Sequence, residues 1–234
     1  MLVVTAHPDD VDFGAAGSVA GWVKAGIDVA YCIVTDGDAG GSDRSISRQD
    51  MAKLRQEEQR AAASEVGVTA VTFLGYPDGR LSASIELRRD VSRVVRQFRP
   101  DRLVCQSPDR YWDRIGASHP DHLAAGEAAT CVAYPDARNP FAHPELLEEG
   151  LEPHAVKELW LMASPHSNRV VDVTTTFDRK IAALRHHKSQ VGDEGDLEER
   201  LRGWLSANAR AAGLEDGSLA ELFQVVQMPP SGSA

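Results

Sequence analysis

The sequence is poor in features that mark several whole classes of protein. Its three cysteines, Cys32, Cys105 and Cys131, are unevenly spaced in apolar surroundings. This pattern indicates buried thiols of a reducing compartment rather than a disulfide framework or a cysteine-rich metal site. No stretch approaches the roughly 20 apolar residues of a membrane span, and no basic region followed by an apolar one marks a secretory signal. We therefore expect a cytoplasmic protein that does not enter a membrane.

Positive charge is also scarce. The chain of 234 residues has 25 lysines and arginines against 35 aspartates and glutamates, a formal net charge of -10. Nucleic-acid phosphates and anionic lipids both require a basic face, so neither is expected as a partner. The net charge does not separate a neutral from a cationic small-molecule partner. A homo-oligomer stays open.

Two nucleotide-binding fingerprints are missing. No Gly-x-Gly-x-x-Gly follows the first apolar run, and the glycine-rich stretch 35–41 carries two aspartates but not the lysine of a P-loop. The chain does, however, alternate apolar runs with helical patterns from its start. This alternation predicts a single α/β domain with a Rossmann-like, mostly parallel sheet flanked by helices. We expect the domain to span 1–226 and residues 227–234 to form a disordered tail.

The expected elements follow from hydrophobic periodicity and from glycine and proline stops. Segment 134–152 is expected to be an irregular surface excursion. Strands are predicted at 2–4, 27–34, 70–74, 102–106, 156–162 and 170–173, and helices at 13–24, 50–66, 85–98, 118–133, 176–190 and 197–212.

A cluster of polar residues follows the first predicted strand. His7, Asp9 and Asp10 stand within four residues of one another at the point where the strand ends. Ligands of open α/β sheets collect at this edge, and such side chains are costly to place together unless a cation or substrate balances them. The alternative is that Asp9 and Asp10 only cap the next helix.

A second cluster lies in mid-chain, in the run Ser118-His119-Pro120-Asp121-His122. Ser118 is a good N-cap and proline is tolerated in a first helical turn, so His119 and His122 are expected three apart on one helix face. Asp121 has an alternative role, which is to favour the helix start through the helix dipole.

Together the two clusters supply the ligands of a catalytic metal. A zinc enzyme uses three nitrogen or oxygen ligands and leaves a position for water, so we assign His7, Asp10 and His122 to Zn²⁺. Asp9 is then available as general base, and His119 as the group that stabilises the oxyanion or protonates the departing amine. Iron, cobalt or nickel would also suit this set. The alternatives are a buried hydrogen-bonded network and a non-haem iron oxygenase, whose scaffold is usually all-β.

These residues carry a resemblance to a known family. Ala6-His7-Pro8-Asp9-Asp10, Thr35-Asp36-Gly37 and Ser118-His119-Pro120-Asp121-His122 together resemble the LmbE-like, or PIG-L, family of zinc-dependent N-acetylglucosaminyl de-N-acetylases. The similarity extends from residue 2 to about residue 190. It implies the same zinc ligands, Asp9 as base, and His119 as the polarising histidine with Asp121 tuning it.

The resemblance also implies substrate-binding residues. Arg55 and Asp78 are expected to hold sugar hydroxyls, and His187 is expected to line the pocket. Their alternatives are a solvated helix arginine for Arg55 and a turn-forming role for Asp78 in Pro-Asp-Gly. Some family members have a tyrosine where this chain has Ala117, so a phenol's role is absent or falls to Tyr111 or another group. Segments 107–117 and 134–155, which would shape substrate entry, carry no recognisable motif and leave the substrate open.

The sequence thus predicts a soluble zinc amidohydrolase that removes an acetyl group from an N-acetylated amino sugar. One alternative keeps the site but cleaves another small-molecule amide. A second alternative is a metal-binding or sugar-binding accessory protein without turnover, which would not need both Asp9 and His119.

Overall fold

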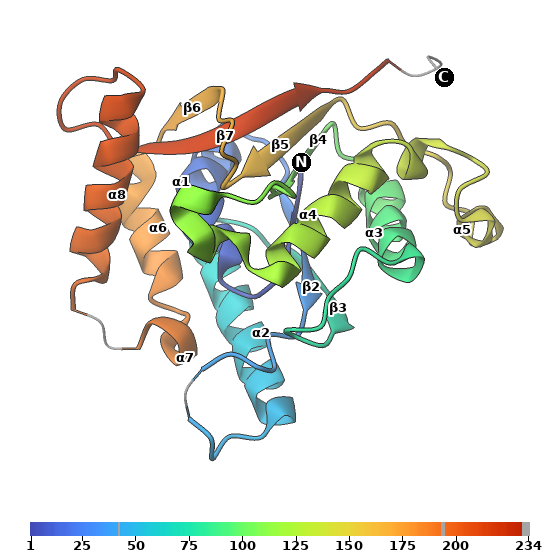
Figure 1. Cartoon of the computed structure of the whole chain (residues 1–234), viewed down its shortest axis with the longest axis horizontal. Helices are drawn as coiled ribbons and strands as arrows, with labels where there is room; N and C mark the ends of the chain where they lie inside the picture. Colours follow the sequence, from blue (N-terminus) through green and yellow to red (C-terminus); the bar gives the residue numbers. More distant parts are fainter. Residues whose placement is uncertain (42, 193–194, 231–234) are drawn as a thin grey trace.

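The computed structural model describes residues 1–41, 43–192 and 195–230. A seven-stranded sheet in the order β3-β2-β1-β4-β5-β7-β6 runs through the middle of the described part (Figure 1). This confirms the predicted α/β class with a mostly parallel sheet. The strands are β1 (Leu2–Thr5), β2 (Ala30–Thr35), β3 (Ala70–Tyr76), β4 (Arg102–Gln106), β5 (Glu158–Met162), β6 (Arg169–Asp172) and β7 (Ala220–Gln227).

The strand order places a topological switch at β1. The chain moves outward from β1 to β2 and β3, then returns to the other side of β1 to form β4 and β5. All of these pairings are parallel, with Val3 opposite Tyr31 on one side and Val104 on the other. Ligands of open α/β sheets bind at the carboxyl ends of the strands beside such a switch. The segments that follow β1 and β4 therefore meet at that edge.

Helices cover both faces of the sheet. One apolar cluster joins alternate residues of β1, β2 and β4 to α3 (Ile85–Phe98) and α4 (Pro120–Ala133), and a second joins the opposite residues to α1 (Asp10–Lys24), α2 (Arg48–Glu65) and α6 (Phe177–Leu184). Because both faces are buried, the central strands β1, β2 and β4 are largely apolar.

A third cluster packs α8 (Leu197–Ala211) against α6, and α8 also contacts β7, where Asn208 Nδ2 donates to the Ala220 carbonyl at 3.0 Å. In Figure 1, α6 and α8 lie at the opposite end of the molecule from α3 and the short helix α5 (Pro144–Glu148). The remaining short elements are η1 (Trp112–Ser118), η2 (Asp136–Arg138), η3 (Thr174–Thr176) and α7 (Lys188–Val191).

Three details differ from the sequence-based expectations. The helix predicted at 176–190 is broken into α6 and α7, with His187 as the residue before α7. α4 is capped by His119, whose Nδ1 accepts from the Asp121 amide at 3.2 Å, because Ser118 ends η1 instead. Strand β7 was not predicted, since its alternation of apolar and polar residues includes a glutamate, Glu221, that only tertiary contacts could bury.

The chain after residue 226 falls partly outside the described residues, which stop at 230. Within the described part, Gln227 ends β7, and the Met228 amide donates to the Lys157 carbonyl at 2.9 Å. Across the described ranges, no helix combines the length and the apolarity that a bilayer crossing requires.

Candidate metal and catalytic site

The two polar clusters converge at the carboxyl edge of the sheet. His7 follows β1, while His119 and His122 follow β4 through η1. The ring centroid of His7 lies 5.0 Å from that of His119 and 5.2 Å from that of His122. The centroids of His119 and His122 are 5.3 Å apart. Side chains separated by more than a hundred positions in the sequence are thus neighbours in space.

Asp10 bridges two of these histidines. Its Oδ2 lies 3.2 Å from His7 Nδ1, and its Oδ1 lies 3.0 Å from His122 Nε2. Burial alone would raise the pKa of Asp10, but the charges and hydrogen bonds of His122 and His7 outweigh it and hold the pKa well below its usual value. The carboxylate is therefore ionised, as a metal ligand must be.

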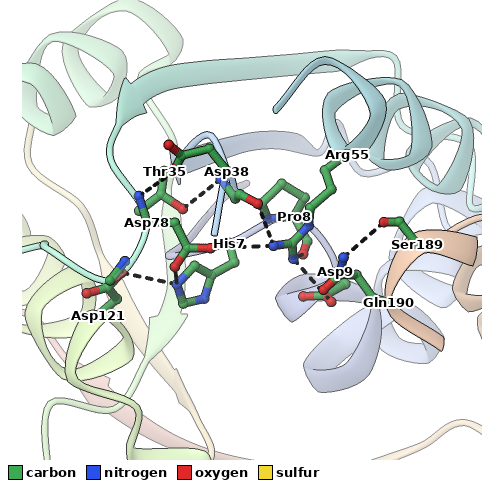
Figure 2. Close-up of polar contacts among 12 residues, drawn as sticks. His7, Pro8, Asp9, Thr35, Asp38, Arg55, Asp78, Asp121, Ser189 and Gln190 are labelled. Atoms are coloured by element: carbon green, nitrogen blue, oxygen red, sulfur yellow. Dashed lines mark hydrogen bonds and ion pairs between the residues drawn. The ribbon is translucent and has the colours of Figure 1, made fainter. Parts of the chain in front are cut away.

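The other side of His7 faces two more carboxylates. Its Nε2 lies 3.2 Å from Asp78 Oδ1 and 3.2 Å from Asp121 Oδ2 (Figure 2). Burial alone would lower the pKa of His7, but hydrogen bonds and charges of Asp10 and Asp78 raise it to about 11. Three carboxylates thus surround one imidazole, whose proton supplies a positive charge that all three contact, while Arg55 Nη1 lies 3.5 Å from Asp78 Oδ2. A divalent cation would supply that charge in its place, so the donor set fits a metal.

Two overlapping groups bring metal-competent atoms within 4.8 Å of one another. One is His7, His119 and His122, and the other is His7, Asp78 and Asp121. The predicted ligands His7, Asp10 and His122 touch one another through Asp10, and they share two members with the first group. The structure therefore brings the predicted ligands together without choosing among these nitrogen and oxygen sets.

Asp9 is held in an unusual backbone conformation. It caps α1 with φ at 94°, a region that residues other than glycine rarely adopt. Its amide donates to Gln59 Oε1 at 2.8 Å, and its Oδ2 lies 3.4 Å from Arg55 Nη2. Burial and then the Asp10 charge raise the pKa of Asp9 to about 7, against the opposing charge of Arg55. A carboxyl with this pKa suits a general base at neutral pH.

Arg55 lies beneath the site rather than at its surface. Its side chain is 4% exposed, and it donates to the carbonyls of Pro8 at 2.6 Å and Gly37 at 2.9 Å (Figure 2). Its Nη1 also lies 3.5 Å from Asp78 Oδ2. Gly37 has φ at +64°, and a Cβ there would come within 2.7 Å of the guanidinium. Arg55 therefore holds the loops after β1, β2 and β3 together, and its expected contact with sugar hydroxyls stays a prediction.

His187 is likewise behind the site. It is fully buried, and its Nε2 lies 2.8 Å from Asp12 Oδ2. The same oxygen accepts from Gln59 Nε2 at 2.9 Å, so His187, Asp12 and Gln59 form a chain that ends at the Asp9 amide. The His187 imidazole is therefore buried behind the site and does not line the cavity, where it was expected.

Asp12 and Gln59 were not predicted as residues that support the site. Gln59 stands four residues after Arg55, so both project from one face of α2. That face also buries Glu58, which accepts from the Ser189 amide at 2.8 Å and from its hydroxyl at 2.6 Å. The charged and polar residues on the buried face of α2 were the feature of the sequence that could have indicated this supporting network.

Asp121 and His119 are linked differently from the expectation. The Asp121 carboxylate accepts from the amides of Gly79 at 2.7 Å and Leu81 at 3.1 Å and contacts His7, whereas the hydrogen bond to His119 Nδ1 comes from the Asp121 backbone amide. Partial burial, then the charges of His7 and His122, lower the pKa of the exposed His119.

A cavity of about 600 Å³ adjoins this cluster and is bordered by Asp10 and His122. Its walls come from η1, α8 and the strands β5 and β7. Side chains that line it include Phe13, Gln106, Tyr111, Arg114, Met162, Ser164, Leu201, Trp204, Glu221 and Leu222.

Comparison with known proteins adds to this geometry. A family model described as PIG-L, GlcNAc-PI de-N-acetylase, matches residues 2–133. Diacetylchitobiose deacetylase of Thermococcus kodakarensis is 31% identical over 83% of this chain and 71% of that protein. A 1D-myo-inositol 2-acetamido-2-deoxy-alpha-D-glucopyranoside deacetylase of Rhodococcus erythropolis is 29% identical over 82% of this chain and 81% of its own length. The solved N,N'-diacetylchitobiose deacetylase of Pyrococcus horikoshii superposes with a TM-score of 0.88 at 28% identity and covers 97% of this chain and 83% of that one.

Proposed function

The chain belongs to the PIG-L, or LmbE-like, family of de-N-acetylases, and from that premise we propose that it is a metal-dependent deacetylase. Its substrate is an N-acetylglucosamine-type sugar or glycoside, and its products are acetate and a free amine. The observation that carries the proposal is the meeting of His7, Asp10, His119 and His122 at one point beside a cavity.

His7, Asp10 and His122 would hold the metal, with zinc as the ion that such nitrogen and oxygen ligands favour. A metal held there would supply Lewis-acid chemistry, which lowers the pKa of a water molecule and polarises an amide carbonyl. The surrounding carboxylates of Asp78 and Asp121 keep His7 oriented, since both lie 3.2 Å from its Nε2.

The protein's own groups move the protons. Asp9 takes a proton as a water molecule attacks the acetyl carbonyl carbon, and its pKa of about 7 suits that task. The carbon–nitrogen bond then breaks as the sugar nitrogen receives a proton from His119, which leaves acetate and an amine. Arg55 and Gln59 keep Asp9 in place throughout, because one contacts its carboxylate and the other its amide.

The relatives indicate which part of the substrate is constant. The names of the proteins compared above share an acetylated amino sugar, and they differ in the group attached to it, a second sugar in one case and inositol in another. We infer that this chain also recognises the acetylated sugar, with Asp78 as the contact for hydroxyls. We assign Arg55 and His187 to the support of the site, because both are buried.

We also propose a cytoplasmic location. The three cysteines are free thiols, and Cys32 and Cys105 are buried. Free thiols of this kind are typical of a reducing compartment.

The proposal is tested by measuring acetate release from N-acetylglucosamine and from N,N'-diacetylchitobiose. Asp9→Asn should lower kcat by about 10²-fold or more while the bound metal, measured by mass spectrometry of the purified protein, is retained. Asp216→Asn, a matched change at an exposed position, should leave the rate unchanged. Undiminished turnover in Asp9→Asn, or after complete removal of the metal, would refute the mechanism.

A further inference from the structure

A glutamine at the carboxyl end of β4 has no role in the site described so far. Gln106 is the last residue of β4, and the residue before it pairs with Val4 of the neighbouring strand β1. Gln106 therefore lies beside the turn that carries His7, at the switch point of the sheet where ligands of such folds bind. The side chain is buried, and it lines the cavity together with Asp10 and His122.

The orientation of the Gln106 amide is fixed by the main chain. Its Oε1 accepts from the Ala6 amide at 2.9 Å. Because a backbone N–H can only donate, the side-chain oxygen must face Ala6, and the NH2 group is the polar end that is left over. Nε2 has no hydrogen-bond partner among the described residues, and it is not sealed in the core. Its two N–H donors are therefore open to the cavity that Asp10 and His122 border.

The backbone around Gln106 is held as firmly as its side chain. A Cβ at Gly126 of α4 would lie 2.4 Å from the Gln106 carbonyl oxygen, so α4 packs directly on this part of the main chain. The next amide, that of Ser107, donates to the Met162 carbonyl at 2.9 Å. Gln106 cannot reorient without losing these contacts. A donor fixed in this way can stabilise negative charge that develops on a reacting atom, because no reorganisation is needed at that moment.

Other polar side chains of the cavity wall already donate within the protein. Ser164 Oγ donates to a glutamine of β7 at 2.6 Å, and Ser167 Oγ donates to the Ser164 carbonyl at 3.3 Å. Asn208 Nδ2 donates to a carbonyl of β7 at 3.0 Å. The NH2 group of Gln106 differs from these three, because its partner within the protein is bound through the oxygen alone.

We propose that Gln106 is a catalytic hydrogen-bond donor, whose NH2 group donates to the acetyl oxygen of the substrate as negative charge develops there. This rests on the deacetylase function proposed above. When the water oxygen bonds to the acetyl carbon, one electron pair of the carbonyl moves onto its oxygen, and it returns when the carbon–nitrogen bond breaks. Gln106 keeps both of its protons, so the proton transfers stay with Asp9 and His119.

The test compares kcat and KM for acetate release by Gln106→Glu and by the unmodified protein at about pH 8, where a glutamate is ionised. Glutamate has the same shape and still offers an oxygen to the Ala6 amide, but it has no donor to place in the cavity. We expect kcat to fall by about 10²-fold, the loss typical of one oxyanion donor. KM and the bound metal should stay unchanged, because the contact is made in the transition state.

Gln106→Met separates the loss of the donor from the new charge of Gln106→Glu, since methionine is neutral. It should lower kcat by a similar factor. It should also lower the thermal midpoint, because the buried Ala6 amide loses its acceptor. Gln106→Glu keeps that acceptor, so a purely structural role for Gln106 would spare its turnover.

Binding of a tetrahedral analogue gives a readout that does not depend on turnover. A phosphonamidate places a tetrahedral phosphorus and a charged oxygen where the acetyl carbon and its oxygen react. Calorimetry on the metal-loaded protein should show binding about 10²-fold weaker in Gln106→Met, because the same donor contacts the charged oxygen. Glucosamine, which lacks that oxygen, should bind equally to both proteins.

The matched control is Gln97→Glu on α3, where the side chain is exposed. α3 ends shortly before β4 begins, so Gln97 lies near the amino edge of the sheet, away from the site. Its kcat should equal that of the unmodified protein.

Three outcomes would overturn the inference while the deacetylase function stands. One is full turnover in Gln106→Glu and Gln106→Met. Another is a rise in KM at unchanged kcat, which would make Gln106 a contact of the bound substrate only. The third is a loss of kcat confined to Tyr111→Phe, which would assign the donor to the phenol that also lines the cavity. Absence of acetate release by the unmodified, metal-loaded protein would instead refute the proposed function, and this inference with it.

Discussion

The part of the chain up to residue 133 and the part after it contribute differently to the site. The earlier part, which the family model matches, supplies all three clustered histidines together with Asp9, Asp10, Asp78 and Asp121. The later part supplies α8, β5 and β7, which form much of the cavity wall. The clustered histidines and carboxylates thus belong to the earlier part, whereas the cavity wall is built by both parts.

The two regions also differ in how their buried charges are used. In the earlier part, buried carboxylates surround histidines and leave a place for a cation. In the later part, Lys180 and Glu221 form a fully buried pair 2.6 Å apart. The same lysine donates to the carbonyls of Asp12 at 2.9 Å and Phe13 at 2.7 Å, and Glu221 accepts from the amides of Gly17 and Ser18. In this second arrangement the lysine and the glutamate neutralise each other, and their hydrogen bonds join β7 and α6 to α1.

The largest effect is expected from His122→Ala. Loss of this proposed metal ligand should lower kcat by about 10⁴-fold or more, because a metal and a positioned water lower the barrier by several kcal/mol. Metal content and acetate release should fall together, while the thermal midpoint in the absence of metal changes little. His166→Ala, at an exposed position of the later region, is the control, and equal losses in both variants would contradict the division between regions.

Lys180→Met should lower the free energy of unfolding more than it lowers the catalytic rate. It leaves Glu221 buried without its partner, which costs about 3–5 kcal/mol of unfolding free energy, measured by urea denaturation. The double variant Lys180→Met with Glu221→Met should recover part of that loss, because no unpaired charge stays buried. Lys157→Met removes a lysine whose pair with Asp101 is 74% exposed on both sides, and it should change stability by less than about 1 kcal/mol. Comparable losses for Lys180 and Lys157 would contradict the structure.

Arg55→Lys should have a moderate effect within the earlier region. Lysine keeps the charge but not the forked geometry that joins the Pro8 and Gly37 carbonyls, so kcat should fall by about tenfold. The charge of Arg55 lowers the pKa of Asp9 against the burial that raises it to about 7. Since Asp9 must be ionised to act as a base, a weaker contact raises its pKa and moves the acidic limb of the rate profile to higher pH.

The control for Arg55→Lys is Arg60→Lys on the same helix, where the side chain is exposed. It should reproduce the unmodified pH profile. A shift of the acidic limb to lower pH in Arg55→Lys would show that the guanidinium does not act on Asp9.

The smallest effect is expected at Glu158 in the later region. Hydrogen bonds from Gln227, Trp160 and Arg102 outweigh partial burial and lower the pKa of Glu158 to about 2. A lowered folded-state pKa contributes stability above the unfolded value, and that contribution is lost as the pH falls towards about 2. Glu158→Gln should therefore cost about 1 kcal/mol at neutral pH and less at pH 3. A cost that grows on acidification would contradict this, and acid-dependent urea denaturation measures it.

Several elements could be predicted from the sequence because their causes are local. The helix Ile85–Phe98 and the strand Arg102–Gln106 have the bounds that their periodicity predicts. The single helix expected at 176–190 is instead broken, because the chain turns at His187 and places its imidazole against Asp12. No pattern in the neighbouring residues indicates this contact. Strand β7 was not predicted for a similar reason, since Glu221 is stabilised in the core by Lys180 of α6 and by the Gly17 and Ser18 amides of α1, which are all distant in the sequence.

What the sequence determined by itself was the chemistry that gathers at the strand ends. A histidine and two aspartates directly after a buried strand, and a second histidine pair at a helix start, predict a metal-centred hydrolase because few other arrangements tolerate those groups together. Only the tertiary structure decided which of the remaining polar residues face the reaction and which support it. Arg55 and His187 became buried supports, and Trp204 became a cavity wall, because burial depends on what packs from distant parts of the chain.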